Sequence, residues 1–242
     1  MKSIFFISDV HLGLHDKLRE KEKEGRLLAF LSYVEEHGDE LFIIGDLFDY
    51  WFEYKYVIPR GFHHTISKLG LMVEKGIRIH YVAGNHDFWL KDFFPKDLGI
   101  PIYKDPFEVM LRGKKFYLHH GDGLALKDTG YRILKKVLRS RLNIFLFTLL
   151  HPDLTARLAK ASSRGSREYS ANKDYGETDG MILFATKKIE SGCDAVVMGH
   201  RHKPLSLKIG SGIYINLGDW ISYSTYAEFN GTDLELRTWA HA

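Results

Sequence analysis

Five short polar motifs combine carboxylate, imidazole and amide side chains in spacings that suit a metal ion. They are Asp9-Val10-His11, Gly45-Asp46-Leu47-Phe48-Asp49, Gly84-Asn85-His86-Asp87, His119-His120-Gly121-Asp122 and Gly199-His200-Arg201-His202. A single one could be an ordinary turn, because Asn and Asp favour turns. Five in succession, each directly after an apolar run, are hard to obtain by chance. The sequence therefore predicts one shared metal site.

The chemical types of the candidate ligands indicate which metal ions they could bind. The candidate ligands are Asp9, His11, Asp46, Asn85, His120, His200 and His202. Carboxylates mixed with imidazoles and one amide suit borderline divalent ions such as Mn²⁺, Fe²⁺ or Zn²⁺ better than Ca²⁺. Seven donors are too many for one tetrahedral ion but suit two ions that share Asp46. Two ions about 3.5–4 Å apart can activate water and clamp a phosphoryl oxygen, so phosphoester hydrolysis with two Mn²⁺ ions is the predicted chemistry.

These motifs need elements that bring them together. In the first half of the chain, strand patterns over 3–8, 41–45 and 77–83 alternate with helical patterns over 20–36 and 63–75. This βαβαβ order, with near-continuous apolar strands, is typical of a largely parallel sheet. Because the carboxyl ends of such strands meet at one edge, the motifs should converge there.

The second half predicts more strands and an insertion. Strand patterns occur over 107–111, 115–119, 194–198, 206–209, 213–217, 223–229 and 234–239. A second, mainly antiparallel sheet is the simplest arrangement for them. Between them, residues 124–170 show two or three helical patterns rich in Leu, Lys and Arg. We interpret the chain as a single domain over 1–242 with a helical cap inserted at about 124–170.

Composition excludes several classes of protein. Hydrophobic residues make up 45% and charged residues 27%, which is ordinary for a globular enzyme. A net charge of +3 without a basic stripe does not predict nucleic-acid binding. Cys193 is the only cysteine, so no internal disulfide can form, and no targeting pattern opens the chain. We therefore expect a cytoplasmic protein, and the sequence leaves its oligomeric state open.

The five motifs, in this order, make the chain resemble the calcineurin-like metallophosphoesterase superfamily over nearly its whole length. The resemblance implies a four-layer α/β/β/α sandwich. It also implies one metal held by Asp9, His11, Asp46 and His202 and a second held by Asp46, Asn85, His120 and His200. His86 would contact the phosphate and help protonate the leaving group. Asp49, the other catalytic candidate, would orient imidazoles, unless it is simply a loop carboxylate.

Within that superfamily the chain resembles the UDP-2,3-diacylglucosamine pyrophosphohydrolases of lipid A synthesis. The shared features are the run Gly45 to Trp51, the run Gly84 to Phe88, His120-Gly121-Asp122 followed by Asp128 and Tyr131-Arg132, and Leu217-Gly218-Asp219-Trp220. One position differs: where this chain has His86, the best-known branch has Arg. The resemblance implies hydrolysis of a nucleotide-linked glycolipid at the α-phosphate. Expected substrate contacts are Asn85, His86, His200, Asp128, Arg132, Arg164, Ser166, Arg167, Asn172 and Lys173.

The insertion supports two interpretations. Its apolar side chains either bind acyl chains or pack the insertion onto the core; they include Leu134, Val137, Leu138, Leu149, Leu150 and those of 144–147. Its basic side chains either meet the anionic cytoplasmic face of the inner membrane or face solvent; they are Arg132, Lys135, Lys136, Arg139 and Arg141. The alternative function is therefore a soluble metallophosphoesterase acting on nucleotides or other small phosphoesters. A non-catalytic scaffold would be expected to lack part of the ligand set, and none is missing.

Overall fold

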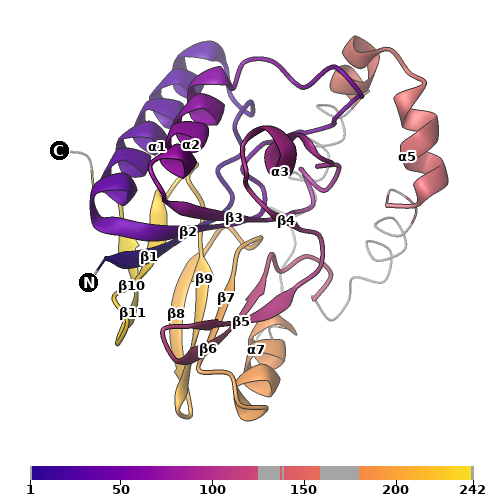
Figure 1. Cartoon of the computed structure of the whole chain (residues 1–242). Helices are drawn as coiled ribbons and strands as arrows, with labels where there is room; N and C mark the ends of the chain where they lie inside the picture. Colours follow the sequence, from indigo (N-terminus) through magenta and orange to yellow (C-terminus); the bar gives the residue numbers. More distant parts are fainter. Residues whose placement is uncertain (1, 125–136, 138, 159–179, 241–242) are drawn as a thin grey trace.

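Two β-sheets form the centre of the molecule, and helices lie against them (Figure 1). The computed structural model describes residues 2–124, 137, 139–158 and 180–240. The first sheet has six strands in the order β11-β10-β1-β2-β3-β4. Their bounds are Ser3–Ile7 (β1), Gly38–Ile44 (β2), Arg78–Val82 (β3), Ile102–Tyr103 (β4), Thr225–Phe229 (β10) and Leu234–Thr238 (β11). The mixed α/β class predicted from the sequence is confirmed.

The second sheet has five strands in the order β5-β6-β7-β9-β8. Their bounds are Phe107–Leu111 (β5), Lys114–His119 (β6), Ala195–Met198 (β7), Pro204–Ile209 (β8) and Gly212–Leu217 (β9). The named helices are Lys17–His37 (α1), His63–Glu74 (α2), Phe93–Asp97 (α3), Arg141–Thr148 (α5) and Gly180–Glu190 (α7). Helices α1 and α2 cover the first sheet, and α7 packs against the second (Figure 1).

Strand β1 shows how the core is divided. All five of its residues are buried, which explains why the strand has a continuous apolar sequence and no alternation. Phe5 and Ile7 belong to the apolar cluster under α1 and α2, whereas Ile4 and Phe6 belong to the cluster between the sheets. A third cluster lies between the second sheet and α7. The strand that leads into the first polar motif is therefore fixed from both faces.

The last two strands are not where the sequence analysis placed them. They were expected in the second sheet, but β10 pairs antiparallel with β1, with Ile4 opposite Phe229, and β11 pairs with β10. The second sheet is also not mainly antiparallel, because β7 runs parallel to both β6 and β9. Apolar patterning shows which face of a strand is buried, but not which neighbour the strand pairs with. Pairing with β10 covers the edge of β1 that β2 leaves open.

The predicted insertion at 124–170 is described in part. It contains α5 and a second helical stretch over 152–158. Phe147 of α5 packs against Phe52 and Trp89, with ring centres 5.1 and 4.7 Å apart. The hydroxyls of Tyr54 and Thr155 are hydrogen bonded at 2.8 Å. The described part of the insertion is thus attached to the loops that follow β2 and β3. Within the described ranges, no helix has the combined length and apolar character needed to cross a bilayer.

Candidate metal centre

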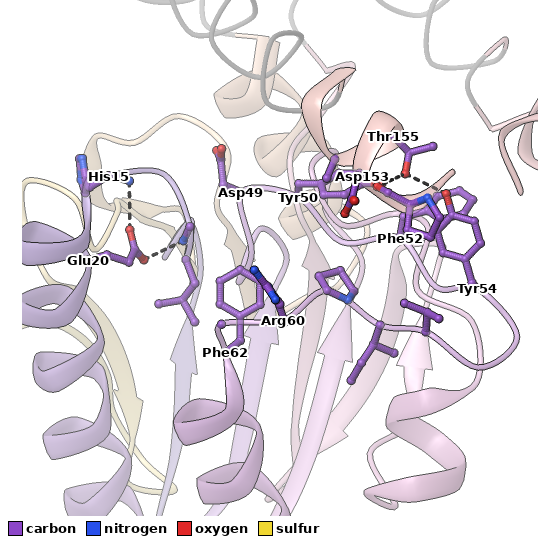
Figure 2. Close-up of a pocket in the computed structure, with 18 of the residues that line it drawn as sticks. His15, Glu20, Asp49, Tyr50, Phe52, Tyr54, Arg60, Phe62, Asp153 and Thr155 are labelled. Carbon is purple, nitrogen blue, oxygen red and sulfur yellow. Dashed lines mark hydrogen bonds between the residues drawn. The ribbon is translucent and has the colours of Figure 1, made fainter. Parts of the chain in front are cut away.

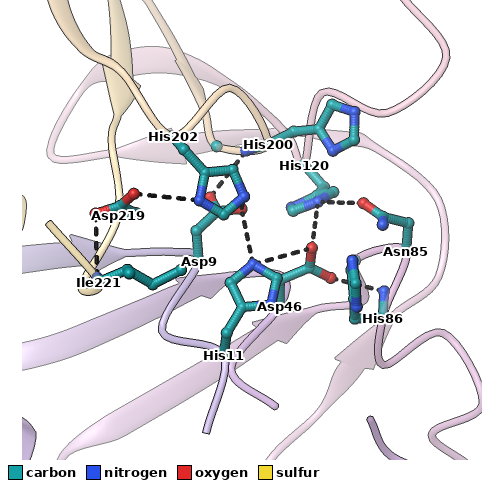
Figure 3. A network of polar contacts seen from close by, with 12 residues as sticks. Asp9, His11, Asp46, Asn85, His86, His120, His200, His202, Asp219 and Ile221 are labelled. Carbon is teal, nitrogen blue, oxygen red and sulfur yellow. Dashed lines mark hydrogen bonds and ion pairs between the residues drawn. The ribbon is translucent and has the colours of Figure 1, made fainter. Parts of the chain in front are cut away.

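The seven side chains predicted as ligands meet at one edge of the two sheets (Figure 3). Each follows directly on a strand, as expected where the carboxyl ends of parallel strands lie together. Asp9 and His11 follow β1, Asp46 follows β2, Asn85 follows β3, His120 follows β6, and His200 and His202 follow β7. Both sheets therefore contribute, and the centre lies where they meet.

Asp46 lies in the middle of this arrangement. Its Oδ2 is 3.2 Å from Nε2 of His120 and 3.8 Å from Nε2 of His11. Its Oδ1 accepts a hydrogen bond of 2.8 Å from the backbone N–H of His86. Nε2 of His120 is also 3.0 Å from Oδ1 of Asn85. One carboxylate therefore faces imidazoles that come from opposite sheets.

A second group of side chains surrounds Asp9. Its Oδ1 lies 3.7 Å from Nε2 of His11 and 3.5 Å from Nε2 of His202. Its Oδ2 accepts a hydrogen bond of 2.8 Å from the backbone N–H of His200. The rings of His11 and His202 stack, with centres 4.9 Å apart. These three side chains form a compact group beside the one around Asp46.

Several buried nitrogen and oxygen atoms of the centre are available to bind a cation. Among the described residues, Asp9 Oδ1 and both ring nitrogens of His11 are buried without a hydrogen-bond partner. Such groups are normally satisfied when buried. Three sets of donor atoms lie close enough together to hold an ion: Asp9, His11 and His202; Asp46, His120 and His200; and His11, Asp46 and His86. The first two sets contain six of the seven predicted ligands in the groups that the family resemblance implied, and their binding of metal stays a prediction.

The electrostatics of the centre agree with this. Burial by itself would lower the pKa of His120, but the adjacent Asp46 raises it to about 10. Burial likewise opposes a raised pKa at His11, where Asp49 and Asp9 bring it to about 9. Burial and the charge of His120 lower the pKa of His200 to about 4. Buried carboxylates thus raise the pKa of two of the imidazoles, and their negative charge is what a divalent ion would balance on binding.

The backbone at the predicted ligands is unusual. Asp9, His11, Asp46, His200 and His202 have φ between 50° and 70°, in the left-handed region. For residues other than glycine this conformation costs about 1–3 kcal/mol each, and it concentrates at functional sites. Backbone hydrogen bonds hold two of these residues in place. The N–H of Asp9 donates to the carbonyl oxygen of Gly45, and the N–H of His11 donates to the carbonyl oxygen of Asp46. The fold thus imposes a backbone geometry that aims these side chains inward.

Two glycines permit the close approach of the loops. A Cβ on Gly84 would lie 2.1 Å from Oδ1 of Asp46, and one on Gly199 would lie 2.4 Å from Oδ2 of Asp9. Any side chain at either position would displace a predicted ligand.

The two predicted catalytic residues lie beside this cluster. Nδ1 of His86 is 3.0 Å from the carbonyl oxygen of Asp49, and because a carbonyl only accepts, Nδ1 must be the donor. This orients the His86 ring edge-on to that of His11, with centres 4.7 Å apart. Oδ1 of Asp49 lies 3.5 Å from Nδ1 of His11. Asp49 is therefore placed to orient both imidazoles.

The remaining predicted substrate contacts lie outside the described residues. They are Asp128, Arg132, Arg164, Ser166, Arg167, Asn172 and Lys173. Arg139, which the sequence analysis treated as a membrane-facing or solvent-facing charge, lies elsewhere. Its guanidinium donates to the carbonyl of Gly84 at 3.2 Å and to Oδ2 of Asp122 at 3.3 Å. That arginine joins the insertion to the loops of the metal centre.

Asp219 supports a predicted ligand, although none of the five polar motifs contains it. Its Oδ2 lies 3.2 Å from Nδ1 of His202, and its Oδ1 accepts hydrogen bonds from three backbone N–H groups, those of residues 221–223. A carboxylate held in this way fixes the ring of a ligating histidine and raises its basicity. The only signal of Asp219 in the sequence is the run Leu217 to Trp220, which belongs to the family resemblance.

A cavity of about 510 Å³ adjoins the centre (Figure 2). It lies between the loop after β1, the loop over 57–62 and the insertion over 152–156. Asp49, whose Oδ1 lies 3.5 Å from Nδ1 of His11, lines it together with Tyr50 and Glu20 (Figure 2). Its walls are more apolar than polar, and the insertion forms one of them.

The model of the calcineurin-like phosphoesterase family matches residues 2–204. A Porphyromonas gingivalis protein named UDP-2,3-diacylglucosamine hydrolase is 34% identical over 254 residues, covering 97% of each chain. An Aeromonas salmonicida protein of the same name is 30% identical, covering 90% of this chain and 86% of its own.

Solved structures share the fold at lower identity. The Escherichia coli phosphoesterase Yfce aligns with a TM-score of 0.50 at 17% identity, covering 98% of this chain and 93% of its own. A novel archaeal phosphodiesterase also has a TM-score of 0.50, at 15% identity, and covers 98% of this chain and 99% of its own.

Two packed sheets with a carboxylate–imidazole centre at their shared edge define a hydrolase of the metallophosphoesterase class. The family match extends over most of the chain and includes all five motifs. The chain belongs to the calcineurin-like phosphoesterase family.

Proposed function

We propose that this enzyme hydrolyses UDP-2,3-diacylglucosamine at the α-phosphate, giving UMP and 2,3-diacylglucosamine 1-phosphate in lipid A synthesis. The observation that carries the proposal is the match to a protein named for that activity, because it covers 97% of both chains. The metal motifs and the insertion therefore both lie within the matched length. The apolar side chains that α5 exposes fit a substrate with acyl chains better than a small phosphoester.

The centre would hold two divalent ions, for which Mn²⁺ is the first candidate. Asp9, His11 and His202 would bind one ion, Asn85, His120 and His200 the other, and Asp46 both. When bound, such ions lower the pKa of water and neutralise developing charge on the phosphoryl oxygens. Water oxygen adds to the α-phosphorus, and the bond from that phosphorus to the bridging oxygen breaks. UMP and the lipid phosphate are released.

The protein's own side chains orient the reactants. The hydrogen bond from Nδ1 of His120 to the carbonyl of Ile44 (2.8 Å) directs its Nε2 toward the centre. Asp219 does the same for His202. Nδ1 of His86 is held by Asp49, so its Nε2 would meet the phosphate and donate a proton to the leaving oxygen. Arg164, Ser166, Arg167, Asn172, Lys173, Asp128 and Arg132 would contact the rest of the substrate.

Replacing His86 by Gln is expected to lower kcat by about 10²-fold, the lower end of what a general acid contributes. The lower end applies because the leaving group is a phosphate, which is already stable as an anion near neutral pH. The measurement is kcat for the lipid substrate and for a p-nitrophenyl phosphodiester, whose phenolate also leaves readily, beside an alkyl phosphodiester that needs protonation. The alkyl ester should lose the most rate. Equal losses for all three would contradict proton donation by His86.

The exposed face of α5 supports a membrane-adjacent site. Phe145 of α5 and Leu149, the C-cap residue that follows it, have exposed fractions of 59% and 67%, whereas Phe147 of α5 packs on Phe52 and Trp89. Exposed side chains here are available to bind acyl chains, and a buried one packs the insertion onto the rest of the protein, so both interpretations of the apolar insertion find support. We expect this face to contact acyl chains or the cytoplasmic surface of the inner membrane.

Replacing Phe145 and Leu149 together by Ser is expected to raise KM for the lipid substrate about tenfold, because tenfold corresponds to only about 1.4 kcal/mol. Burial of such side chains contributes at least that much. The measurement is KM in mixed micelles, together with sedimentation on anionic vesicles. Leu71→Ser on α2, where the exposed fraction is 52%, is the matched control. An unchanged KM in the double variant would assign this face no part in substrate binding.

The decisive experiment is Mn²⁺-supported release of UMP from UDP-2,3-diacylglucosamine beside UDP-N-acetylglucosamine, which has no long acyl chains. Strong turnover of the lipid alone supports the proposal. Equal turnover of both would favour the alternative, a soluble metallophosphoesterase acting on small phosphoesters. Robust hydrolysis of simple nucleotides with none of the lipid would refute the lipid assignment.

A further inference from the structure

A buried ammonium group lies directly under the loop that carries His11. Lys23 is on the second turn of α1, and its side chain has an exposed fraction of 1%. Nζ donates a hydrogen bond of 2.5 Å to the carbonyl oxygen of His11. It also lies 3.3 Å from Oε1 of Glu20, one turn earlier on the same helix. A lysine is rarely buried so completely unless it is paired.

Glu20 holds the same loop from the other end. Its Oε1 accepts a hydrogen bond of 2.7 Å from the backbone N–H of Gly13, and its Oε2 accepts one of 3.0 Å from that of His15 (Figure 2). Asp16 caps the start of α1 by accepting from the N–H groups of residues 18 and 19. Lys23 and Glu20 together therefore fix three backbone groups between residues 11 and 15, and the capped helix gives both side chains a rigid base.

The loop that Lys23 and Glu20 contact has an unfavourable backbone conformation at His11. His11 has φ of 50°, which is unfavourable for a residue with a Cβ. Burial lowers the pKa of Lys23, and Glu20 opposes that effect. Burying an ion pair seldom adds net stability compared with apolar residues of similar size. An apolar side chain at position 23 would therefore stabilise α1 better than a buried lysine does. The presence of Lys23 points to a role in holding the adjacent loop.

We propose that Lys23 and Glu20 are positioning residues of the metal centre, which hold the His11 loop so that its ring faces Asp9 and His202. The pair would thereby set the affinity of the cation site formed by Asp9, His11 and His202. This inference rests on the proposed role of His11 as a ligand. Lys23 and Glu20 act on the backbone of residues 11–15, whereas Asp46, His120 and His200 are carried by the loops after β2, β6 and β7, so the effect should be confined to one of two ions.

The test is Mn²⁺ binding to the full chain after removal of metal by chelation, measured by isothermal titration. The unaltered protein should bind two ions. In Lys23→Met, which keeps the length of the side chain without its charge, one site should lose affinity about 10- to 100-fold, the usual effect of losing a group that orients a ligand. The other site should be unchanged. Saturating Mn²⁺ should restore most of kcat, with KM for the substrate unaltered.

Two further variants keep the result interpretable. Lys21→Met changes an exposed lysine two residues away and should bind both ions normally. Glu20→Gln should weaken the same single site by a smaller factor, and it serves as the test if Lys23→Met does not fold by circular dichroism. Equal affinities in Lys23→Met and the unaltered protein, or equal losses at both sites, would overturn the inference. Failure of the unaltered protein to bind Mn²⁺ would instead overturn the proposed function, and this inference with it.

Discussion

Replacing Asp46 by Ala is expected to slow hydrolysis by about 10³–10⁵-fold, the equivalent of about 4–7 kcal/mol of transition-state stabilisation lost with the metal centre. The effect is large because Oδ2 of Asp46 faces both His11 and His120, so both proposed cation sites lose a ligand together. Metal content after dialysis should fall with the rate. The measurements are kcat/KM for UMP release and elemental analysis of bound Mn²⁺.

The control for Asp46 is Asp105→Ala, which removes an exposed carboxylate of the same type far along the chain from any motif. It should keep full activity and full metal content. Circular dichroism separates a lost centre from a lost fold. An Asp46→Ala protein that keeps two ions and more than about a tenth of the rate would contradict the shared-ligand assignment, since removing a residue of a cooperating unit normally costs far more.

Replacing Phe6 by Ala is expected to lower the free energy of unfolding by about 3–5 kcal/mol. Its ring is stacked between that of Phe42, 5.2 Å away in the same sheet, and that of Phe116, 5.8 Å away in the facing sheet. No part of Phe6 is exposed, so the cavity would open in the middle of the inter-sheet cluster. For a chain of this size the melting temperature should fall by about 6–20 °C.

Thermal and urea denaturation measure this loss of stability. Tyr56→Ala is the matched control, because that aromatic side chain has an exposed fraction of 85% and its removal should change the free energy by no more than about 0.5 kcal/mol. A loss below about 1 kcal/mol in Phe6→Ala would mean that the two sheets repack around the missing ring. That outcome would contradict the rigid inter-sheet cluster described above.

The positions of the motifs could be predicted because they depend on local signals. A buried strand has a recognisable apolar run, and a polar residue directly after it must emerge at the end of that strand. This is why Asp9, Asp46 and Asn85 were correctly placed at a common edge. His120 and His200 were placed by the same argument, although they belong to the other sheet. That these side chains act as ligands stays a prediction.

Long-range pairings could not be predicted in this way. Nothing in the alternation of residues 225–229 indicates that β10 pairs with β1 and not with the second sheet. Asp219 and Lys23 were missed for a related reason: Asp219 is 17 residues from His202 and Lys23 is 12 residues from His11, so neither contact follows from the spacing within a motif. Such contacts depend on which elements are neighbours in space, whereas single-sequence patterns describe only neighbours along the chain.

The pairing of β1 with β10 has a consequence for biosynthesis. Ile4 can pair with Phe229 only after the intervening chain, through both sheets, has been made, and the N–H of Trp220 can reach the carbonyl of Asp9 only at a similarly late point. Until then the nascent chain displays an apolar strand with an unpaired edge, the kind of surface that associates with other unfinished chains. Nascent chains that stop before Asp219 would therefore lack both the β10 partner of β1 and the loop that orients His202, and they would be prone to aggregate.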